Sequence, residues 1–128
     1  MSALVDTQIL VWFLREPRRL SERTREELGR SKAVPFFSAI SIWEVSIKSA
    51  LRRADFDIDP RFLRAHLLAS GWTELPFTGE HAVAVRDLPS IHADPFDRAL
   101  LAQAIVEGVE LVTADKALAG YGAPVRGM

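Results

Sequence analysis

Short apolar runs alternate along this chain with longer segments of helical periodicity, and two of the runs lead into an aspartate. Ala3-Leu4-Val5 is followed by Asp6, and Leu111-Val112-Thr113 is followed after one residue by Asp115. Strands separated by helices are typical of a parallel sheet with helices on both faces. The carboxyl ends of such strands form the crevice where open parallel sheets bind ligands. We therefore expect an α/β fold that places Asp6 and Asp115 at one edge of its sheet.

The expected elements follow from periodicity and from turn and cap residues. Asp59-Pro60 and Asp94-Pro95 each resemble an N-cap with proline at the first helical position, and Gly108 ends the second of these helices. Strands are expected at residues 3–6, 34–38, 72–75, 110–113 and 124–126. Helices are expected at residues 7–14, 22–30, 40–53, 60–69, 79–86, 96–107 and 116–119.

Length and composition indicate a single globular domain covering residues 1–128. Hydrophobic residues make up 48% and charged residues 26%, which is ordinary for such a chain. No apolar stretch approaches the roughly 20 residues of a membrane span. The N-terminus lacks the basic region of a secretory signal, so a cytoplasmic location is expected. The absence of cysteine excludes disulfides, thiol catalysis and cysteine-based zinc sites.

The charge distribution leaves two readings open. The net charge of −1 is not the basic signature of a nucleic-acid-binding domain. Most of the 16 basic residues are arginine, however, and several stand in local groups such as Arg52/Arg53. Arginine binds phosphate bidentately, so these groups are compatible with a nucleic-acid substrate. They are equally compatible with solvated helix faces.

Each acidic candidate also has a purely structural explanation. Asp6 and Asp115 could simply cap the helices that follow them. Glu44 lies beside an apolar stripe, where a carboxylate needs a partner or a cation. Lys48, four residues later, offers an ordinary helix ion pair.

Asp94 and Asp97 stand at the start of the helix expected at 96–107. Asp94 is placed as its N-cap, and Asp97 stands three residues later, where an acid can reach back in a capping box. The same geometry would bring both acids to a helix N-terminus near the edge of the sheet. Clustered carboxylates without cysteine favour a hard cation such as Mg²⁺ or Mn²⁺. Together the acids indicate metal-assisted hydrolysis of a phosphodiester.

Other metal and nucleophile patterns are incomplete. Asp55, Asp57 and Asp59 alternate like the start of a calcium loop, but Pro60 and His66 stand where that loop needs glycine and glutamate. The three histidines show no metal-binding spacing, and no Gly-x-Ser-x-Gly elbow is present. His92 could have a minor role through its closeness to Asp94.

Four blocks of the sequence resemble the PIN-domain family and, within it, the VapC-type toxins of bacterial type II toxin–antitoxin pairs. The blocks stand in family order and extend over nearly the whole chain. They are Leu4-Val5-Asp6-Thr7-Gln8-Ile9-Leu10, Ser38-Ala39-Ile40-Ser41-Ile42-Trp43-Glu44-Val45, His92-Ala93-Asp94-Pro95-Phe96-Asp97-Arg98-Ala99-Leu100-Leu101-Ala102-Gln103-Ala104 and Leu111-Val112-Thr113-Ala114-Asp115. Gln8 departs from the histidine often found at its position, and Ile40 from a small residue.

The resemblance implies a three-layer α/β/α fold with a mainly parallel five-stranded sheet and a ribonuclease dependent on Mg²⁺ or Mn²⁺. Carried over by position, Asp6, Glu44, Asp97 and Asp115 form the catalytic and metal-binding acids, with Asp6 and Asp97 as direct ligands. Lesser roles, in supporting the acids or contacting substrate, fall to Asp94, Arg98 and Thr113.

The partners implied by the resemblance are an RNA substrate, a small antitoxin that covers the acidic groove, and a second copy of the chain in a homodimer. Trp12, Phe13 and Leu20 could anchor the antitoxin, or they could belong to the core.

Competing functions match the sequence less well. A haloacid-dehalogenase phosphatase requires a second aspartate at the position of Gln8. A response regulator requires an aspartate at the end of the strand at 34–38, where this chain has none. A catalytically silent PIN-like binding module remains an alternative.

Overall fold

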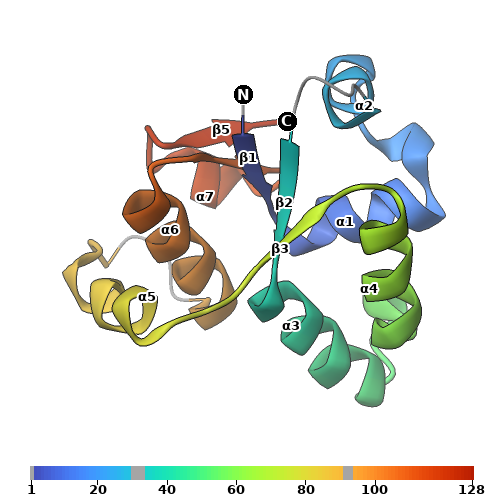
Figure 1. Ribbon diagram of the computed structural model, residues 1–128, viewed down its shortest axis with the longest axis horizontal. Helices are drawn as coiled ribbons and strands as arrows, with labels where there is room; N and C mark the ends of the chain where they lie inside the picture. Colours follow the sequence, from blue (N-terminus) through green and yellow to red (C-terminus); the bar gives the residue numbers. More distant parts are fainter. Residues whose placement is uncertain (1, 30–33, 91–93) are drawn as a thin grey trace.

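A five-stranded sheet forms the centre of the computed structural model, which describes residues 2–29, 34–90 and 94–128. Figure 1 shows this sheet between two groups of helices. The strand order is β3-β2-β1-β4-β5, and every neighbouring pair is parallel. The strands are β1 (Ser2–Val5), β2 (Val34–Ser38), β3 (Thr73–Leu75), β4 (Glu110–Thr113) and β5 (Val125–Gly127).

Helices connect successive strands and cover both faces of the sheet. The α-helices are α1 (Thr7–Arg15), α2 (Glu22–Gly29), α3 (Ala39–Ala50), α4 (Pro60–Ala69), α5 (Gly79–Ala84), α6 (Pro95–Glu107) and α7 (Lys116–Ala119). Three short 3-10 helices complete the described chain: η1 (Pro17–Arg19), η2 (Ala54–Phe56) and η3 (Val85–Asp87). The three-layer α/β fold predicted from the sequence is confirmed.

Two hydrophobic cores lie on opposite faces of the sheet, because side chains alternate along each strand. Val5, Phe37 and Val112 belong to the core under α1 and α4. Their neighbours Leu4 and Leu111 belong to the core under α6 and α7. Figure 1 shows α5 and α6 on one side of the strands and α1, α3 and α4 on the other. Burial on both faces explains why the three inner strands, β1, β2 and β4, are largely apolar.

The helix expected at 40–53 is shorter in the structure. It ends at Ala50, and Arg52 has a φ of 57°, in the left-handed region that a helix cannot continue through. The helix expected at 79–86 changes after Ala84 into η3. The helix expected at 22–30 is described as far as Gly29, because Arg30 lies outside the described residues, as does His92.

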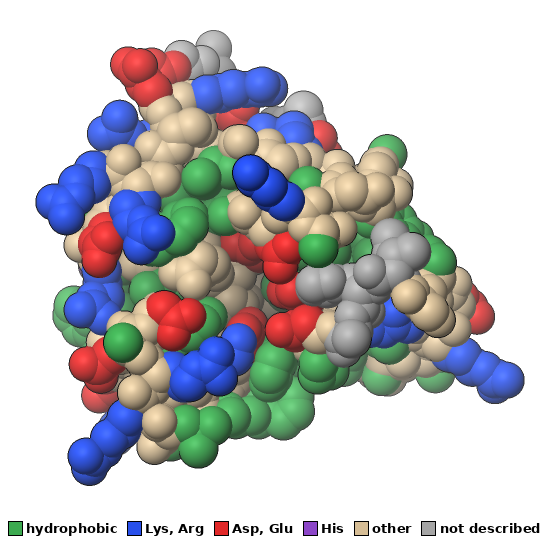
Figure 2. Space-filling model, turned by 180° about the vertical axis from the view of Figure 1, so that it is seen from behind, with side chains coloured by type: hydrophobic (Ala, Val, Ile, Leu, Met, Phe, Trp, Pro, Cys, Tyr) green, Lys and Arg blue, Asp and Glu red, His purple; other side chains and the backbone are tan. Residues whose placement is uncertain are grey.

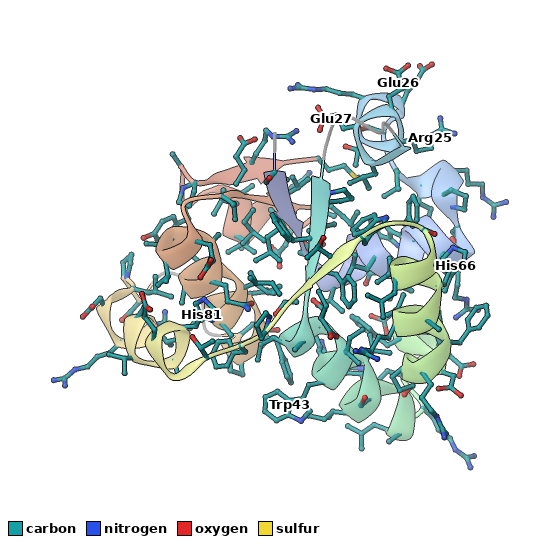
Figure 3. The ribbon with its side chains drawn as sticks, in the orientation of Figure 1. Arg25, Glu26, Glu27, Trp43, His66 and His81 are labelled. Carbon is teal, nitrogen blue, oxygen red and sulfur yellow. The ribbon has the colours of Figure 1, made fainter. Side chains whose placement is uncertain are left out.

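Ile40, Trp43 and Leu51 stand at helical spacing in the helix expected at 40–53, which predicts a buried apolar face, and this prediction is wrong for two of them. Ile40 is buried, but Trp43 is 57% exposed and Leu51 is 68% exposed. Figure 3 shows the Trp43 side chain pointing away from α3 at the edge of the molecule. Periodicity identifies an apolar face of a helix, but it does not tell how far the neighbouring elements extend over that face.

Among the helices in the described part of the chain, none is both long enough and apolar enough to cross a lipid bilayer.

Candidate active site

All the acids singled out from the sequence line one pocket at the carboxyl ends of the strands. The pocket has a volume of about 230 Å³, and the acids in its wall are Asp6, Glu44, Asp94, Asp97 and Asp115. Asp6 directly follows β1, and Asp115 follows β4, the strand that pairs with β1. Glu44 comes from α3, whereas Asp94 and Asp97 stand at the start of α6. Figure 2 shows the face on which acidic side chains gather around a hollow, with Lys and Arg side chains beyond it.

Asp6 is fixed at the floor of the pocket by contacts with two neighbouring elements. Its backbone N–H continues the parallel ladder by donating to the carbonyl of Val112, at 3.0 Å. One carboxylate oxygen caps α1 by accepting from the backbone N–H of Ile9, at 3.0 Å. The other accepts from the hydroxyl of Thr113 and, at 3.1 Å, from the backbone N–H of Ala114. The carboxylate is therefore held in one orientation between β1 and β4.

Burial disfavours the charged form of Asp6 in spite of these donors. The side chain is almost completely buried, and desolvation raises its pKa from 3.8 to about 6. The hydrogen bonds from Thr113, Ile9 and Ala114 lower this pKa, and the negative charge of Asp97 raises it further. A divalent cation in the pocket would favour the ionised form, because a positive charge close to a carboxylate lowers its pKa.

Glu44 is buried beside Asp6 and has both of its oxygens engaged. The hydroxyl of Thr7 donates to Glu44 Oε1 at 2.6 Å and also lies 2.9 Å from the Ser41 hydroxyl. The ammonium of Lys48 donates to Glu44 Oε2 at 2.5 Å. The helix ion pair considered from the sequence is thus present, and it lies in the wall of the pocket.

Three of the acids cap helices that begin at the pocket. Asp94 accepts from the backbone N–H groups of Phe96 and Asp97, at 2.8 and 3.2 Å. Asp115 accepts from those of Ala117 and Leu118, at 2.8 and 3.3 Å. Asp6 caps α1 in the same way. The positive ends of these helix dipoles offset part of the repulsion among the carboxylates. These three residues therefore cap helices and also line the same pocket.

Thr113 and Arg98, the two non-acidic candidates, occupy different surroundings. The Thr113 hydroxyl donates to Asp6 and accepts from the backbone N–H of Asp115, at 2.9 Å, so it connects two acids of the pocket. The guanidinium of Arg98 donates to the carbonyls of Pro89 and Val85, at 3.0 and 3.2 Å, and Arg98 is absent from the pocket wall.

Of the two aromatic residues considered as anchors for a partner, Phe13 lies beside the core and Trp12 lies at the pocket. Phe13 packs on Trp72, with ring centroids 5.2 Å apart, beside the core. Trp12 lines the acidic pocket, and the Arg19 guanidinium lies 4.5 Å from its ring centroid. Leu20 is buried in the core.

The donor set of the pocket fits a hard divalent cation in its chemistry, because every candidate ligand is a carboxylate oxygen. The side chains are not preassembled as a cage, however. Within residues 2–29, 34–90 and 94–128, no group of three or more His, Asp or Glu side chains has the geometry of a metal site. One acid, Glu44, is already bound to an ammonium.

Several residues of the pocket wall, among them Thr7, Lys48 and Phe56, were not identified as site residues from the sequence. Thr7 and Lys48 surround Glu44, and Phe56 in η2 forms part of the wall. Lys48 had a sequence signal in its spacing from Glu44, but that signal is common to surface ion pairs. Phe56 had no signal in the sequence, because η2 reaches the pocket only through the packing of the loop that follows α3.

A model of the PIN domain family matches residues 3–123. Among curated protein sequences, none matches the chain.

Three solved VapBC structures share the fold at 16% sequence identity. A chain in the structure of VapBC2 from Rickettsia felis, bound to a DNA fragment from their promoter, superposes with a TM-score of 0.73, covering 99% of this chain and 98% of that one. DNA-bound VapBC from Salmonella typhimurium gives 0.67, and VapBC-1 from nontypeable Haemophilus influenzae gives 0.64; each covers 100% of this chain and 97% of the other.

Proposed function

The chain belongs to the PIN domain family, and on this premise we propose that it is a metal-dependent endoribonuclease and the toxin of a type II toxin–antitoxin pair. The observation that carries the proposal is the convergence of Asp6, Glu44, Asp97 and Asp115 on one pocket. These residues come from four separate parts of the sequence. Helix capping alone would require none of them to lie near the others.

The residues have distinct roles in this proposal. Asp6 and Asp97 would hold a Mg²⁺ or Mn²⁺ ion, with Asp115 and Glu44 completing the negative environment. Such an ion would supply an activated water and neutralise charge at the scissile phosphate. Thr113 keeps the Asp6 carboxylate oriented, and Asp94 fixes the start of α6, from which Asp97 projects. The substrate is RNA, bound through its backbone at the rim of the pocket.

The biological assignment extends to the partners. The similar solved structures are VapBC complexes, which supports a small antitoxin as the cognate partner of this chain. We include in the proposal a homodimer and a cytoplasmic location, where the RNA substrate would be met. Light scattering of the purified chain, alone and with the product of a neighbouring small gene, tests the assembly.

A catalytically silent binding module is the alternative. It would keep the fold but would have no need for an acidic pocket that repels RNA. The charge on Asp6 is a cost to the metal-free fold, since burial raises its pKa. A binding module would gain nothing from that cost.

The test is cleavage of structured and unstructured RNA by the purified protein in Mn²⁺, with EDTA as the negative control. We expect cleavage that Asp97→Asn reduces at least about a hundredfold, because the change removes a ligand charge. Asp59→Asn is the matched control, since Asp59 caps α4 through Arg61 but lies outside the pocket. Circular dichroism verifies that each variant is folded.

Two outcomes contradict the proposal. Equal cleavage by wild type and Asp97→Asn would remove the pocket from the chemistry. RNA binding without Mn²⁺-dependent cleavage would favour the silent module.

A further inference from the structure

Lys48 is the single basic residue among the described residues that line the acidic pocket. The same pocket is lined by five acidic residues, Asp6, Glu44, Asp94, Asp97 and Asp115. Its ammonium lies 2.5 Å from Glu44 Oε2, and the side chains of Lys48 and Glu44 are only 17% and 5% exposed. An ion pair this well buried is screened much less than a surface helix pair.

Two aromatic rings fix the ammonium in this position. The Lys48 nitrogen lies 4.4 Å from the ring centroid of Phe56 and 5.6 Å from that of Phe96. Phe96 is itself held by Trp43, with centroids 5.3 Å apart. A lysine on the exposed surface of α3 would extend its ammonium into water. The Lys48 ammonium is instead enclosed by side chains from η2, α3 and α6.

The second carboxylate oxygen of Glu44 is hydrogen-bonded as well. Its Oε1 accepts from the Thr7 hydroxyl at 2.6 Å, so neither oxygen is directed only at the open pocket. The contacts of Glu44 therefore differ from those of Asp6, whose partners are all N–H or O–H groups without formal charge.

We propose that Lys48 is the resident counter-cation of the acidic pocket, which keeps Glu44 out of direct metal coordination and lowers the affinity of the pocket for divalent ions. The proposal rests on the proposed function, since it concerns the same metal site. With Lys48 in place, the pocket tolerates its acids without metal, and the ion is held by the aspartates rather than by Glu44. Lys48 is thus a positioning residue, which acts through Glu44 and through the charge of the pocket.

The test measures Mn²⁺ dissociation constants by titration calorimetry of the full chain, together with the melting temperature in EDTA. Lys48→Met keeps the apolar stem and removes the charge. We expect it to bind Mn²⁺ about tenfold more tightly, because like charges repel strongly in a partly buried pocket. The same variant should melt at a lower temperature in EDTA, since the carboxylates then lack their counter-ion.

Two further variants separate charge from packing. Lys48→Arg retains the charge and should stay within about twofold of the wild-type dissociation constant. Lys116→Met makes the same chemical change one residue from Asp115 but outside the pocket wall, and it should leave Mn²⁺ binding unchanged.

The outcomes are distinct. Unchanged or weaker Mn²⁺ binding by Lys48→Met, with a lower melting temperature, would overturn the proposal and leave Lys48 a structural residue. An equal gain in affinity for Lys116→Met would also overturn it, because net charge alone would explain the effect. Failure of the wild type itself to bind Mn²⁺ or cut RNA would overturn the proposed function, and this inference with it.

Discussion

The hydroxyl of Thr113, at the end of β4, donates a hydrogen bond to the carboxylate of Asp6, at the end of β1. The two residues are 107 positions apart in the chain and meet because β1 and β4 are parallel neighbours. Through Thr113 the backbone of Asp115 is tied to the same carboxylate. The sheet thereby sets the position of one acid relative to another.

Removal of the Thr113 hydroxyl should therefore affect both acids. Thr113→Val keeps the shape and the β propensity but leaves Asp6 with one donor fewer and the Asp115 N–H without its acceptor. We expect a loss of about 1–3 kcal/mol in the free energy of unfolding, measured by urea denaturation. The pKa of Asp6 should rise, because a hydrogen bond that lowers it is lost. A variant as stable as the wild type, with an unchanged pH profile, would contradict this role.

The stability of the metal-free protein should depend on pH through Asp6. Its pKa in the folded state, about 6, lies above the ordinary value of 3.8, so between these values the folded protein retains a proton that the unfolded chain releases. The contribution of Asp6 to stability is therefore complete below about pH 4 and is lost as the pH rises through about 6. The loss amounts to roughly 3 kcal/mol.

Urea denaturation in EDTA across this pH range measures the effect, with Asp6→Asn as the comparison. The difference in stability between wild type and variant should shift in favour of the variant as the pH rises from 4 to 7. A difference that stays constant would show that Asp6 ionises as easily in the folded state as in the unfolded chain.

Divalent ions should reverse this penalty. Mn²⁺ at a hundred times its dissociation constant stabilises a protein that binds it only when folded by about 2.7 kcal/mol. We expect a higher melting temperature in Mn²⁺ than in EDTA, with a larger difference at pH 7.5 than at pH 5, because protonation of Asp6 competes with the ion. Asp97→Asn should abolish most of the difference, and a full Mn²⁺ effect in that variant would contradict the assigned ligand.

A buried polar network outside the pocket wall, centred on Gln103, should be structural rather than catalytic. Gln103 accepts from the Ser38 hydroxyl at 2.5 Å and donates to the carbonyl of Pro76 at 3.2 Å, so it connects α6 to β2 and to the segment after β3. Gln103→Leu removes the acceptor of the Ser38 hydroxyl and the Gln103 donor to the Pro76 carbonyl, at an expected cost of about 2–4 kcal/mol. The folded fraction should still cut RNA at the wild-type rate per molecule. A folded variant with lost activity would assign Gln103 a role in the site.

The sequence predicted the sheet and the acidic pocket well because both depend on local signals. An apolar run predicts a strand, a following aspartate predicts a cap, and parallel strands bring such caps to one edge. The same signals were insufficient for the helix expected at 40–53, because Trp43 and Leu51 of its apolar stripe are largely exposed.

Two further features depend on contacts between distant elements and so had no signature in the sequence. The ammonium of Lys48 packs against the rings of Phe56 and Phe96. The ring of Phe96 in turn lies nearly perpendicular to that of Trp43. His81 of α5 is buried, and its ring lies 2.8 Å from a Glu107 oxygen at the end of α6. Each of these arrangements exists only once the helices have packed.

The most direct test of the metal site is diffraction from crystals grown in Mn²⁺, recorded at the manganese absorption edge. We expect an anomalous peak in the pocket with Asp6 and Asp97 oxygens in its coordination shell and the Glu44–Lys48 pair intact beside it. A peak that these aspartates do not touch, or an empty pocket in crystals of protein that cuts RNA, would contradict the proposed metal site.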